Sequence, residues 1–265
     1  KWAMRRGDPV STALGSFVSR HQDLLVPGPG LSVDFTRTYN SSDPRKGDLG
    51  VGWTYTYGMS AVDRGNGDVI VTFADGRTGL YTASGGAFTA PDGFLAELSK
   101  SGEEFVLADV DQRTYTFRVA DGKLMRIADP NGNTLTFTYT QNNYVLTDAV
   151  GREYHVKTKD DTYIEEIRDP MGRTLKFAYD GDMLVSFTDA ENGVILYAYN
   201  GDMLLTSITD ANGHVFVTNH YDGQKRVDSQ KDAAGNTATF AYQDSPRITT
   251  VVDNEGNASI DEYDD

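Results

Sequence analysis

The sequence has no cysteine, only 8 prolines in 265 residues, and no long hydrophobic run. The absence of cysteine excludes disulfides and cysteine-rich zinc sites, and it leaves the redox compartment open. No apolar run approaches the length of a membrane span, and no signal peptide can be recognised. Packing and hydrogen bonds must therefore hold the chain together without covalent crosslinks.

Basic residues are also scarce, with 24 Lys and Arg against 39 Asp and Glu and a net charge of −15 at pH 7. Nucleic-acid-binding proteins normally carry the opposite sign, so we expect no nucleic-acid partner. Apolar residues make up 38% of the chain and aromatic residues 11%, including 15 tyrosines. This composition argues against disorder and favours sheets whose faces are covered by amphipathic rings.

What the sequence does have is a repeated phrase. "YDGDMLVSFTDAENG", from Tyr179, is followed by "YNGDMLLTSITDANG", from Tyr199. The glycine that ends the phrase recurs at intervals of 19, 21, 21, 20, 22 and 21 residues, at Gly132, Gly151, Gly172, Gly193, Gly213, Gly235 and Gly256. Most of these glycines are followed about seven positions later by a tyrosine, at Tyr139, Tyr179, Tyr199, Tyr221, Tyr242 and Tyr263. Tandem repetition at this period indicates a structural unit that is stacked.

Each unit predicts one β-hairpin. Apolar residues alternate with others along "TLKFAYDGDML", which is the period of a half-buried strand. Asp180-Gly181 and Asn200-Gly201 can supply the positive backbone angles that a two-residue hairpin turn requires. The returning strand carries an apolar pair three residues apart, which predicts a bulge or a strong twist. These pairs are Leu124/Ile127, Ile164/Ile167, Leu184/Phe187, Leu205/Ile208 and Ile248/Val251.

The D-x-x-G sequence closes the unit. Its aspartate can cap its own turn, and its glycine can take the left-handed conformation. In the copy before Gly132, Gln112 stands where the glycine belongs, so the pattern fades toward the N-terminus. One hairpin cannot bury its apolar face alone, and neighbouring hairpins must therefore pair into a continuous sheet.

The predicted fold class is all-β, with tandem antiparallel β-hairpin repeats that form a curved or spiralling sheet. We assign residues 1–75 to a cap-like N-terminal segment that precedes the repeats. Residues 76–265 are assigned to the repeats, which are degenerate to about residue 128 and regular from about residue 129. We expect this N-terminal segment to cap one end of the sheet, and the other end, after Gly256, to be uncapped.

The unit Y-[DN]-G…L-x-x-[IV]-x-D-x-x-G resembles the YD repeat of the Rhs family, which includes bacterial polymorphic toxins and wall-associated proteins and has the animal teneurins as relatives. The N-terminal part is similar to the segment that often precedes such repeats. The residues that carry this second resemblance are Gly7-Asp8-Pro9-Val10, Gly15, Asp23-Leu24, Pro27-Gly28, Arg37-Thr38-Tyr39-Asn40-Ser41, Leu49-Gly50 and Gly52-Trp53. The resemblance implies a long β-sheet that spirals into a hollow shell, often around a C-terminal toxin.

The family toxins end this shell with a proline-led motif that finishes in D-P-x-G-L and supports self-cleavage. Asp129-Pro130-Asn131-Gly132 and Asp169-Pro170-Met171-Gly172 are superficially similar, but both fall inside the repeat period. We interpret both as repeat turns. Because the chain opens with Lys1 and stops partway through a repeat at Asp265, we expect it to be a piece of a longer protein.

Candidate sites for chemistry are sparse. The acidic turns at Asp129 and Asp210 offer oxygen ligands for calcium, but Asx-turns explain the same residues without a metal. His214 and His220 are six residues apart, a spacing that puts both on one face of an unbroken strand, and an acid/base pair there is conceivable. His21 and His155 are the other histidines. Nothing else marks a catalytic site, so we expect no enzyme activity, no catalytic residues, no metal site and no cofactor.

Trp53, Tyr55 and Tyr57 alternate along one predicted strand. Such rings could stack on sugars, but a ladder of core aromatics is the favoured interpretation. The resemblance implies a non-catalytic structural module of a secreted or cell-surface Rhs-type protein, forming part of a β shell that encapsulates or displays a C-terminal toxin or effector. The alternative is an adhesin-like module that recognises glycans or proteins at the cell surface. The partners expected are therefore the remainder of the same chain and, on the alternative, a surface glycan or protein.

Overall fold

The computed structural model describes residues 5–6 and 9–264, in which every regular element is a β-strand. Gly7 and Asp8 of the pre-repeat motif lie outside the described residues, as do Lys1 and Asp265. The strands before the regular repeats are β1 (Arg5–Arg6), β2 (Val10–Ser11), β3 (Ser16–Val26), β4 (Val33–Asn40), β5 (Lys46–Gly47), β6 (Gly50–Val51), β7 (Trp53–Tyr55), β8 (Ser60–Asp63), β9 (Val69–Thr72), β10 (Thr78–Ser84), β11 (Ala87–Thr89), β12 (Glu97–Ser101), β13 (Glu104–Ala108) and β14 (Thr114–Arg118).

The remaining strands follow at the repeat period. They are β15 (Leu124–Ala128), β16 (Thr134–Thr140), β17 (Asn143–Thr147), β18 (Glu153–Lys159), β19 (Tyr163–Arg168), β20 (Thr174–Asp180), β21 (Met183–Thr188), β22 (Val194–Tyr199), β23 (Leu205–Thr209), β24 (Val215–Tyr221), β25 (Val227–Asp232), β26 (Thr237–Asp244), β27 (Arg247–Val252) and β28 (Ala258–Glu262). The all-β prediction is confirmed, and each repeat supplies one antiparallel hairpin.

The chain forms two compact units that interleave along the sequence. Unit 1 contains the described residues up to 21, residues 38–53 and those from 176 onward. Unit 2 contains residues 22–37 and 54–175. The division into residues 1–75 and 76–265 stays a prediction.

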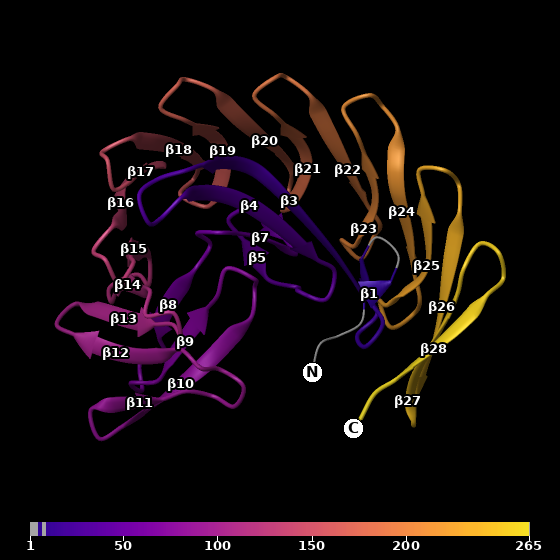
Figure 1. Cartoon of the computed structure of the whole chain (residues 1–265), viewed down its shortest axis with the longest axis horizontal. Helices are drawn as coiled ribbons and strands as arrows, with labels where there is room; N and C mark the ends of the chain where they lie inside the picture. Colours follow the sequence, from indigo (N-terminus) through magenta and orange to yellow (C-terminus); the bar gives the residue numbers. More distant parts are fainter. Residues whose placement is uncertain (1–4, 7–8, 265) are drawn as a thin grey trace. The chain divides into compact units, whose positions relative to one another are not determined.

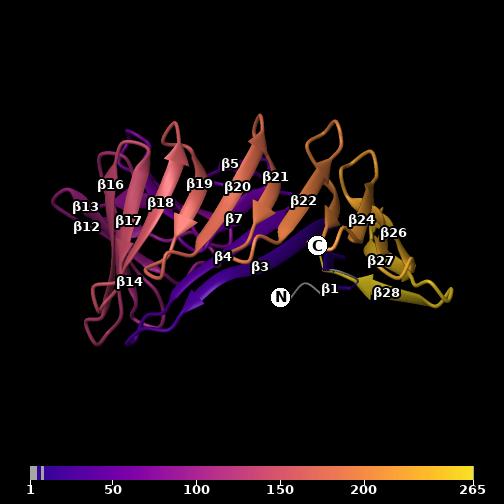
Figure 2. The same ribbon diagram turned by 90° about the horizontal axis from the view of Figure 1, so that it is seen from above.

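In unit 2, the strands from β12 to β19 pair in chain order, each antiparallel to the next. A smaller sheet holds β8 to β11, again in chain order. In unit 1, the strands from β20 to β28 pair in the same way, and β1, β2 and β3 form a short antiparallel ladder. Figure 1 shows that the strands from β20 to β28 of unit 1 follow a bend, and Figure 2 shows β20, β21 and β22 side by side.

Bulges interrupt the ladder where the apolar pairs have a spacing of three. The extra residue of the returning strand directly follows the first apolar position, and it is Met125, Glu165, Val185, Thr206 or Asp228 in successive bulged hairpins. The bulge prediction is therefore confirmed for four of the five predicted pairs. It is wrong for Ile248/Val251, because β26 and β27 pair without a register shift.

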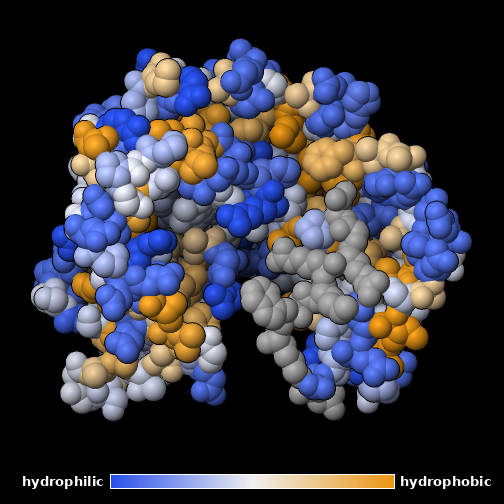
Figure 3. All heavy atoms as spheres, viewed as in Figure 1, coloured by the Kyte–Doolittle hydropathy of each residue, from blue (hydrophilic) through white to orange (hydrophobic). Residues whose placement is uncertain are grey.

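The core lies on the face to which the alternating apolar residues point. In β21, for example, Leu184 and Phe187 are buried, and in β23 the equivalent Leu205 and Ile208 are buried as well. A spacing of three would turn the second side chain away from the core in a regular strand, but the bulge restores it to the same face. Figure 3 shows hydrophobic residues scattered among hydrophilic ones on the viewed surface. Among the described residues, no helix is long and apolar enough to cross a membrane.

Candidate functional site

In the closing turns, the aspartate side chain accepts hydrogen bonds from backbone amides of the turn. Asp169 Oδ1 accepts from the backbone N of Met171 at 2.9 Å and from that of Arg173 at 2.8 Å. Gly172, between them, has a φ of 83°. The same double acceptance occurs at Asp109, Asp129, Asp148, Asp189, Asp210 and Asp253. These aspartates are occupied in shaping turns, as Asx-turn chemistry predicts.

The predicted glycines mostly hold the left-handed position of these turns, with φ between 81° and 90°. They are Gly132, Gly151, Gly172, Gly213, Gly235 and Gly256. Gly193 does not, because it lies four residues after Asp189 and not three. Asn192 takes the left-handed position instead, with a φ of 66°, and the Gly193 amide donates to Asp189 Oδ1 at 2.7 Å. The assignment of Gly193 to the D-x-x-G position was therefore wrong; asparagine tolerates this conformation best after glycine.

The opposite turns differ from the prediction. Asp180 and Met183 pair directly, so the two-residue loop is Gly181-Asp182, and Gly181 has a φ of 56°. The positive angles expected at Asn200-Gly201 do not occur.

Met203 holds the left-handed conformation in that turn, at a φ of 62°. Asn200 starts the turn as an aspartate does elsewhere, and its Oδ1 accepts from the backbone N of Asp202 and Leu204, both at 3.0 Å. The turn at Asn200 therefore has the same hydrogen bonds as the closing turns at the other end of the hairpins.

Tyr179 and Tyr199 occupy equivalent places beside a bulge. Tyr179 pairs with Leu184 and Tyr199 pairs with Leu205, in each case where the register shifts. The Tyr199 hydroxyl donates to the Leu184 carbonyl on the strand before it, at 2.7 Å. Three more repeat tyrosines make the same bond to the residue just before the bulge on the preceding strand: Tyr139 to Leu124, Tyr221 to Leu205 and Tyr242 to Val227. The tyrosines thus tie one hairpin to the next.

In unit 1, the N-terminal segment binds backbone groups at the bulges. The Leu205 amide donates to the Tyr39 hydroxyl at 2.9 Å, and burial raises the pKa of Tyr39 to about 12. The Val227 amide donates to the Gly15 carbonyl at 2.8 Å. Trp53 Nε1 donates to the Tyr199 hydroxyl at 2.9 Å. Bulges leave amides outside the ladder, and the N-terminal segment supplies acceptors for them.

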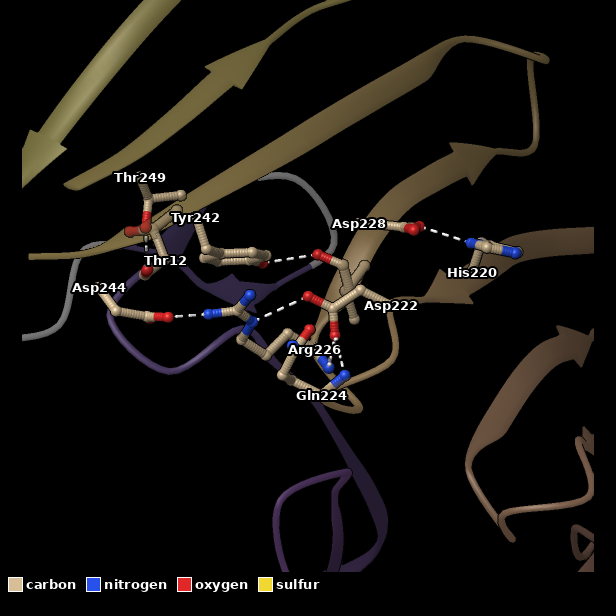
Figure 4. A network of polar contacts seen from close by, with 10 residues as sticks. Thr12, His220, Asp222, Gln224, Arg226, Asp228, Tyr242, Asp244 and Thr249 are labelled. Carbon is tan, nitrogen blue, oxygen red and sulfur yellow. Dashed lines mark hydrogen bonds and ion pairs between the residues drawn. The ribbon is translucent and has the colours of Figure 1, made fainter. Parts of the chain in front are cut away.

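Arg226 lies at the centre of the polar network in Figure 4. Its Nε donates to Asp222 Oδ2 at 2.9 Å and its NH1 to Asp244 Oδ1 at 3.0 Å. Its guanidinium lies 4.5 Å from the centre of the Tyr242 ring. A Cβ on Gly15 would stand 2.4 Å from Arg226 Cβ, so the backbone at Gly15 packs directly onto this arginine. Sequence reasoning missed Arg226, and the signal that could have found it is the Asn or Arg four residues after most turn aspartates.

The last strands also bind the N-terminal segment. The Thr12 hydroxyl donates to Asp261 Oδ2 at 2.8 Å and contacts the Tyr263 hydroxyl. The Thr249 hydroxyl donates to the Thr12 carbonyl at 2.6 Å. The expectation that the C-terminal end has no cap is corrected in part: Thr12, 249 residues away, binds the side chain of Asp261, whereas β28 has a paired strand on one side only among the described residues. No local pattern around Thr12 could signal a contact of that separation.

In unit 2, the loop "PGPG" packs on two successive closing turns. Arg152 NH2 donates to the Pro27 carbonyl at 2.7 Å while its Nε donates to Asp148 Oδ2 at 2.6 Å. A Cβ on Gly30 would stand 2.0 Å from Asp129 Oδ2. The turns therefore also serve as docking points.

A buried ion pair holds the strands on either side of this loop. Arg37 Nε lies 2.6 Å from Asp23 Oδ2, with side-chain exposures of 1% and 6%. Burial raises the pKa of Asp23 to about 6, although Arg37 opposes the shift. Arg37 and Asp23 both belong to the quoted pre-repeat motif, but no local pattern connects the two charges.

The three alternating aromatics are core residues. Trp53, Tyr55 and Tyr57 are 1%, 5% and 4% exposed. Trp53 packs at 5.1 Å from Tyr197 in unit 1, and Tyr57 packs at 5.3 Å from Phe137 in unit 2. The core interpretation is confirmed, and these rings offer no surface for sugar stacking.

The histidines do not form a site. His214 precedes β24 and lies 3.7 Å from Asp210, whereas His220 Nδ1 lies 2.6 Å from Asp228 Oδ1. A register shift interrupts the pairing of β23 with β24 at a point between the two histidines. His155 faces Glu153 at 3.5 Å, and His21 contacts the Phe216 ring. Within residues 5–6 and 9–264, no group of three His, Cys, Asp or Glu side chains could hold a metal ion.

The pre-repeat segment matches a known sequence family. A family model described as "Domain of unknown function (DUF6531)" covers residues 7–81. The chain also matches the tRNA nuclease WapA of Bacillus subtilis (strain 168), with 29% identity over 135 residues. These matches support the resemblance of the chain to the Rhs/YD-repeat family.

The matched region covers 51% of this chain and 6% of the WapA relative. The tRNA3(Ser)-specific nuclease WapA of Bacillus spizizenii matches to the same extent. The chain therefore spans only a small part of the length of these curated relatives. The crystal structure of TcdB2-TccC3 without its hypervariable C-terminal region is similar at 11% identity and a TM-score of 0.41, over 86% of this chain and 14% of that one.

Proposed function

We propose that this chain is a non-catalytic structural module of a secreted or surface Rhs-type protein. Its repeats form part of a β shell that encapsulates or displays a C-terminal effector. The observation that carries the proposal is where the repeated side chains are used. The recurring aspartates shape turns, as at Asp169, and the recurring tyrosines tie hairpins together, as at Tyr199.

The matched relatives support the same proposal. They are named as tRNA nucleases, and the chain corresponds to 6% of their length. A module that repeats one hairpin without repeating any nucleophile, base or orienting group suits the wall of such a protein better than its catalytic end. An adhesin-like role has no comparable support, since Trp53, Tyr55 and Tyr57 are buried.

The test uses the full-length protein from which this chain derives. Trp53→Ala removes a buried indole and its bond to Tyr199, and Lys176→Ala, at an exposed position, is the matched control. Protease resistance and toxicity of the C-terminal region are measured in both variants. We expect the region to lose its protection with Trp53→Ala and to keep it with Lys176→Ala. Equal protection in both variants, with the repeats shown by circular dichroism to be disrupted, would contradict the shell. Turnover of RNA, peptide or polysaccharide by the isolated chain would contradict the non-catalytic assignment.

A further inference from the structure

The chain contains five Asn-Gly dipeptides, at Asn66, Asn131, Asn192, Asn200 and Asn212. This dipeptide can cyclise, because glycine has no side chain to hinder attack of its own backbone nitrogen on the preceding Asn Cγ. The five copies share one local sequence chemistry. What differs among them is how the fold holds the amide and the attacking nitrogen.

The turn at Asn200 binds the side-chain oxygen of this asparagine and leaves the Gly201 amide accessible. Two backbone amides, from Asp202 and Leu204, donate to its Oδ1 at 3.0 Å each. Paired amide donors on a carbonyl oxygen stabilise the negative charge that develops there during nucleophilic attack. Gly201 is exposed, nothing lies within 4 Å of where its Cβ would be, and its amide has no acceptor among the described residues.

Three of the other dipeptides have the attacking nitrogen engaged. The glycine amides donate from Gly132 to the Asp129 carbonyl, from Gly213 to the Asp210 carbonyl and from Gly193 to Asp189 Oδ1. Asn66 differs in another way: its Oδ1 accepts one amide, from Asp68, and its Nδ2 donates to Asp68 Oδ2 at 2.9 Å. The fold thus distinguishes Asn200 from all four.

We propose that Asn200 is a self-modification site, which the folded chain deamidates through a cyclic imide. The Gly201 nitrogen forms a bond to Asn200 Cγ and gives up its proton, and the Cγ–Nδ2 bond breaks to release ammonia. Water then opens the ring at either carbonyl. One opening gives aspartate, and the other gives isoaspartate, in which the main chain runs through the former side chain.

The two products differ in what they do to the turn. The next equivalent turn already uses an aspartate: Asp222 Oδ1 accepts from the backbone N of Gln224 and Arg226 at 2.9 Å. The aspartate product therefore keeps the turn. Isoaspartate lengthens the main chain by one atom and removes the carboxylate from the two amides. Isoaspartate therefore loosens the turn that leads into Leu205, whose amide donates to the Tyr39 hydroxyl of the N-terminal segment.

The test is peptide mapping by mass spectrometry of the folded chain, incubated at mildly alkaline pH. We expect Asn200 to deamidate at least about fivefold faster than Asn212, because two extra hydrogen bonds favour the reacting state. In the urea-unfolded chain all five sites should react at similar rates. A folded chain in which Asn200 reacts no faster than Asn212 would overturn the proposal.

Asp222→Asn tests whether the paired amide donors cause the fast deamidation, because it creates a second asparagine with two such donors. The variant places an amide in the second two-donor turn, ahead of Gly223, whose amide also has no acceptor among the described residues. We expect position 222 to become a second fast site, with the urea midpoint confirming that the variant is folded. A folded variant that stays unmodified at position 222 while Asn212 reacts at its usual rate would show that the paired donors are not the cause.

Discussion

Gly15 and Gly201 are both turn glycines, but their surroundings differ. A Cβ on Gly15 would stand 2.4 Å from Arg226 Cβ, and its φ is 68°. Gly201 has no positive φ, and nothing lies within 4 Å of where its Cβ would be. We expect Gly15→Ala to lower the free energy of unfolding by about 2 kcal/mol, through overpacking and backbone strain.

Gly201→Ala is the matched control, and we expect it to change the unfolding free energy by less than about 0.5 kcal/mol. Urea denaturation followed by tryptophan fluorescence measures both. Equal costs for the two variants would show that the contact between Gly15 and Arg226 relaxes without loss.

Asp23 links stability to pH. Its pKa in the folded chain is about 6, against an ordinary value of 3.8, because burial outweighs the attraction of Arg37, and Asp34 adds to the rise. A raised folded pKa means that folding favours the protonated group. The stability it contributes is complete below about pH 4 and is lost as pH rises through about 6.

We therefore expect wild type to lose about 3 kcal/mol relative to Asp23→Asn between about pH 4 and about pH 7. Urea midpoints across this range measure the difference between the two chains. Asp92→Asn, at an exposed position, should keep a constant offset from wild type. A constant offset for Asp23→Asn as well would contradict the raised pKa.

Between elements, the repeat tyrosines hold one hairpin to the next, and the Tyr199 hydroxyl also binds a buried indole. The Tyr199 hydroxyl donates to the Leu184 carbonyl and accepts from Trp53 Nε1, whereas the Tyr139 hydroxyl donates to the Leu124 carbonyl. Tyr199→Phe leaves both a carbonyl and a buried indole N–H without the hydroxyl. We expect it to cost about 2–3 kcal/mol of unfolding free energy, and Tyr139→Phe to cost about 1 kcal/mol. Thermal and urea denaturation measure both losses. A smaller loss of unfolding free energy for Tyr199→Phe than for Tyr139→Phe would contradict a stabilising bond between Trp53 and Tyr199.

The hairpins themselves could be predicted from the sequence, because alternation, glycine and aspartate act within a few residues. The sequence could not show that Asn192, and not Gly193, takes the left-handed position of its turn. Asparagine and glycine both reach the left-handed region, and only the distance from Asp189 decides between them. Met203 in that conformation could not be predicted either, because side-chain type gives no warning there. The turn holds Met203 in the left-handed conformation, because the backbone amides of Asp202 and Leu204, on either side of it, both donate to Asn200 Oδ1.

The candidate site was less predictable than the fold. Trp53 as a core residue follows from its alternating pattern, but its partner Tyr199 is 146 residues away. Thr12 belongs to no motif, and the place of Arg226 four residues after a turn aspartate says nothing of its partner. Only the folded ladder brings Thr249 to Thr12 and Arg226 to Gly15. Contacts of such separation depend on the register of every intervening hairpin, which local patterns do not fix.

For the whole molecule, charge and an open strand edge act against each other. β28 pairs with β27 on one side, and Ile260 on it is 62% exposed. An edge of this kind tends to pair with another chain, whereas the net charge of −15 opposes association. We expect association of the chain to increase as added salt screens the repulsion.

Light scattering across a salt series measures this association. Ile260→Lys, which places a charge on the edge strand, should suppress it. Hydrogen exchange should show lower protection after Val251 than in β20 to β23. A chain that stays monomeric at every salt concentration, with its last strand as protected as the middle ones, would contradict the open edge.

The contacts of the N-terminal segment with the repeats carry a consequence for how this gene can change. Gly30 packs on the turn at Asp129, Tyr39 receives the Leu205 amide and Thr12 binds Asp261, each at a fixed place along the chain. A tandem repeat normally gains and loses copies easily, because one unit can replace another. Here, duplicating or deleting one hairpin between these places would move every later partner by a whole unit. We therefore expect related genes to keep a constant copy number across residues 129–261, and to vary in copy number only outside that interval.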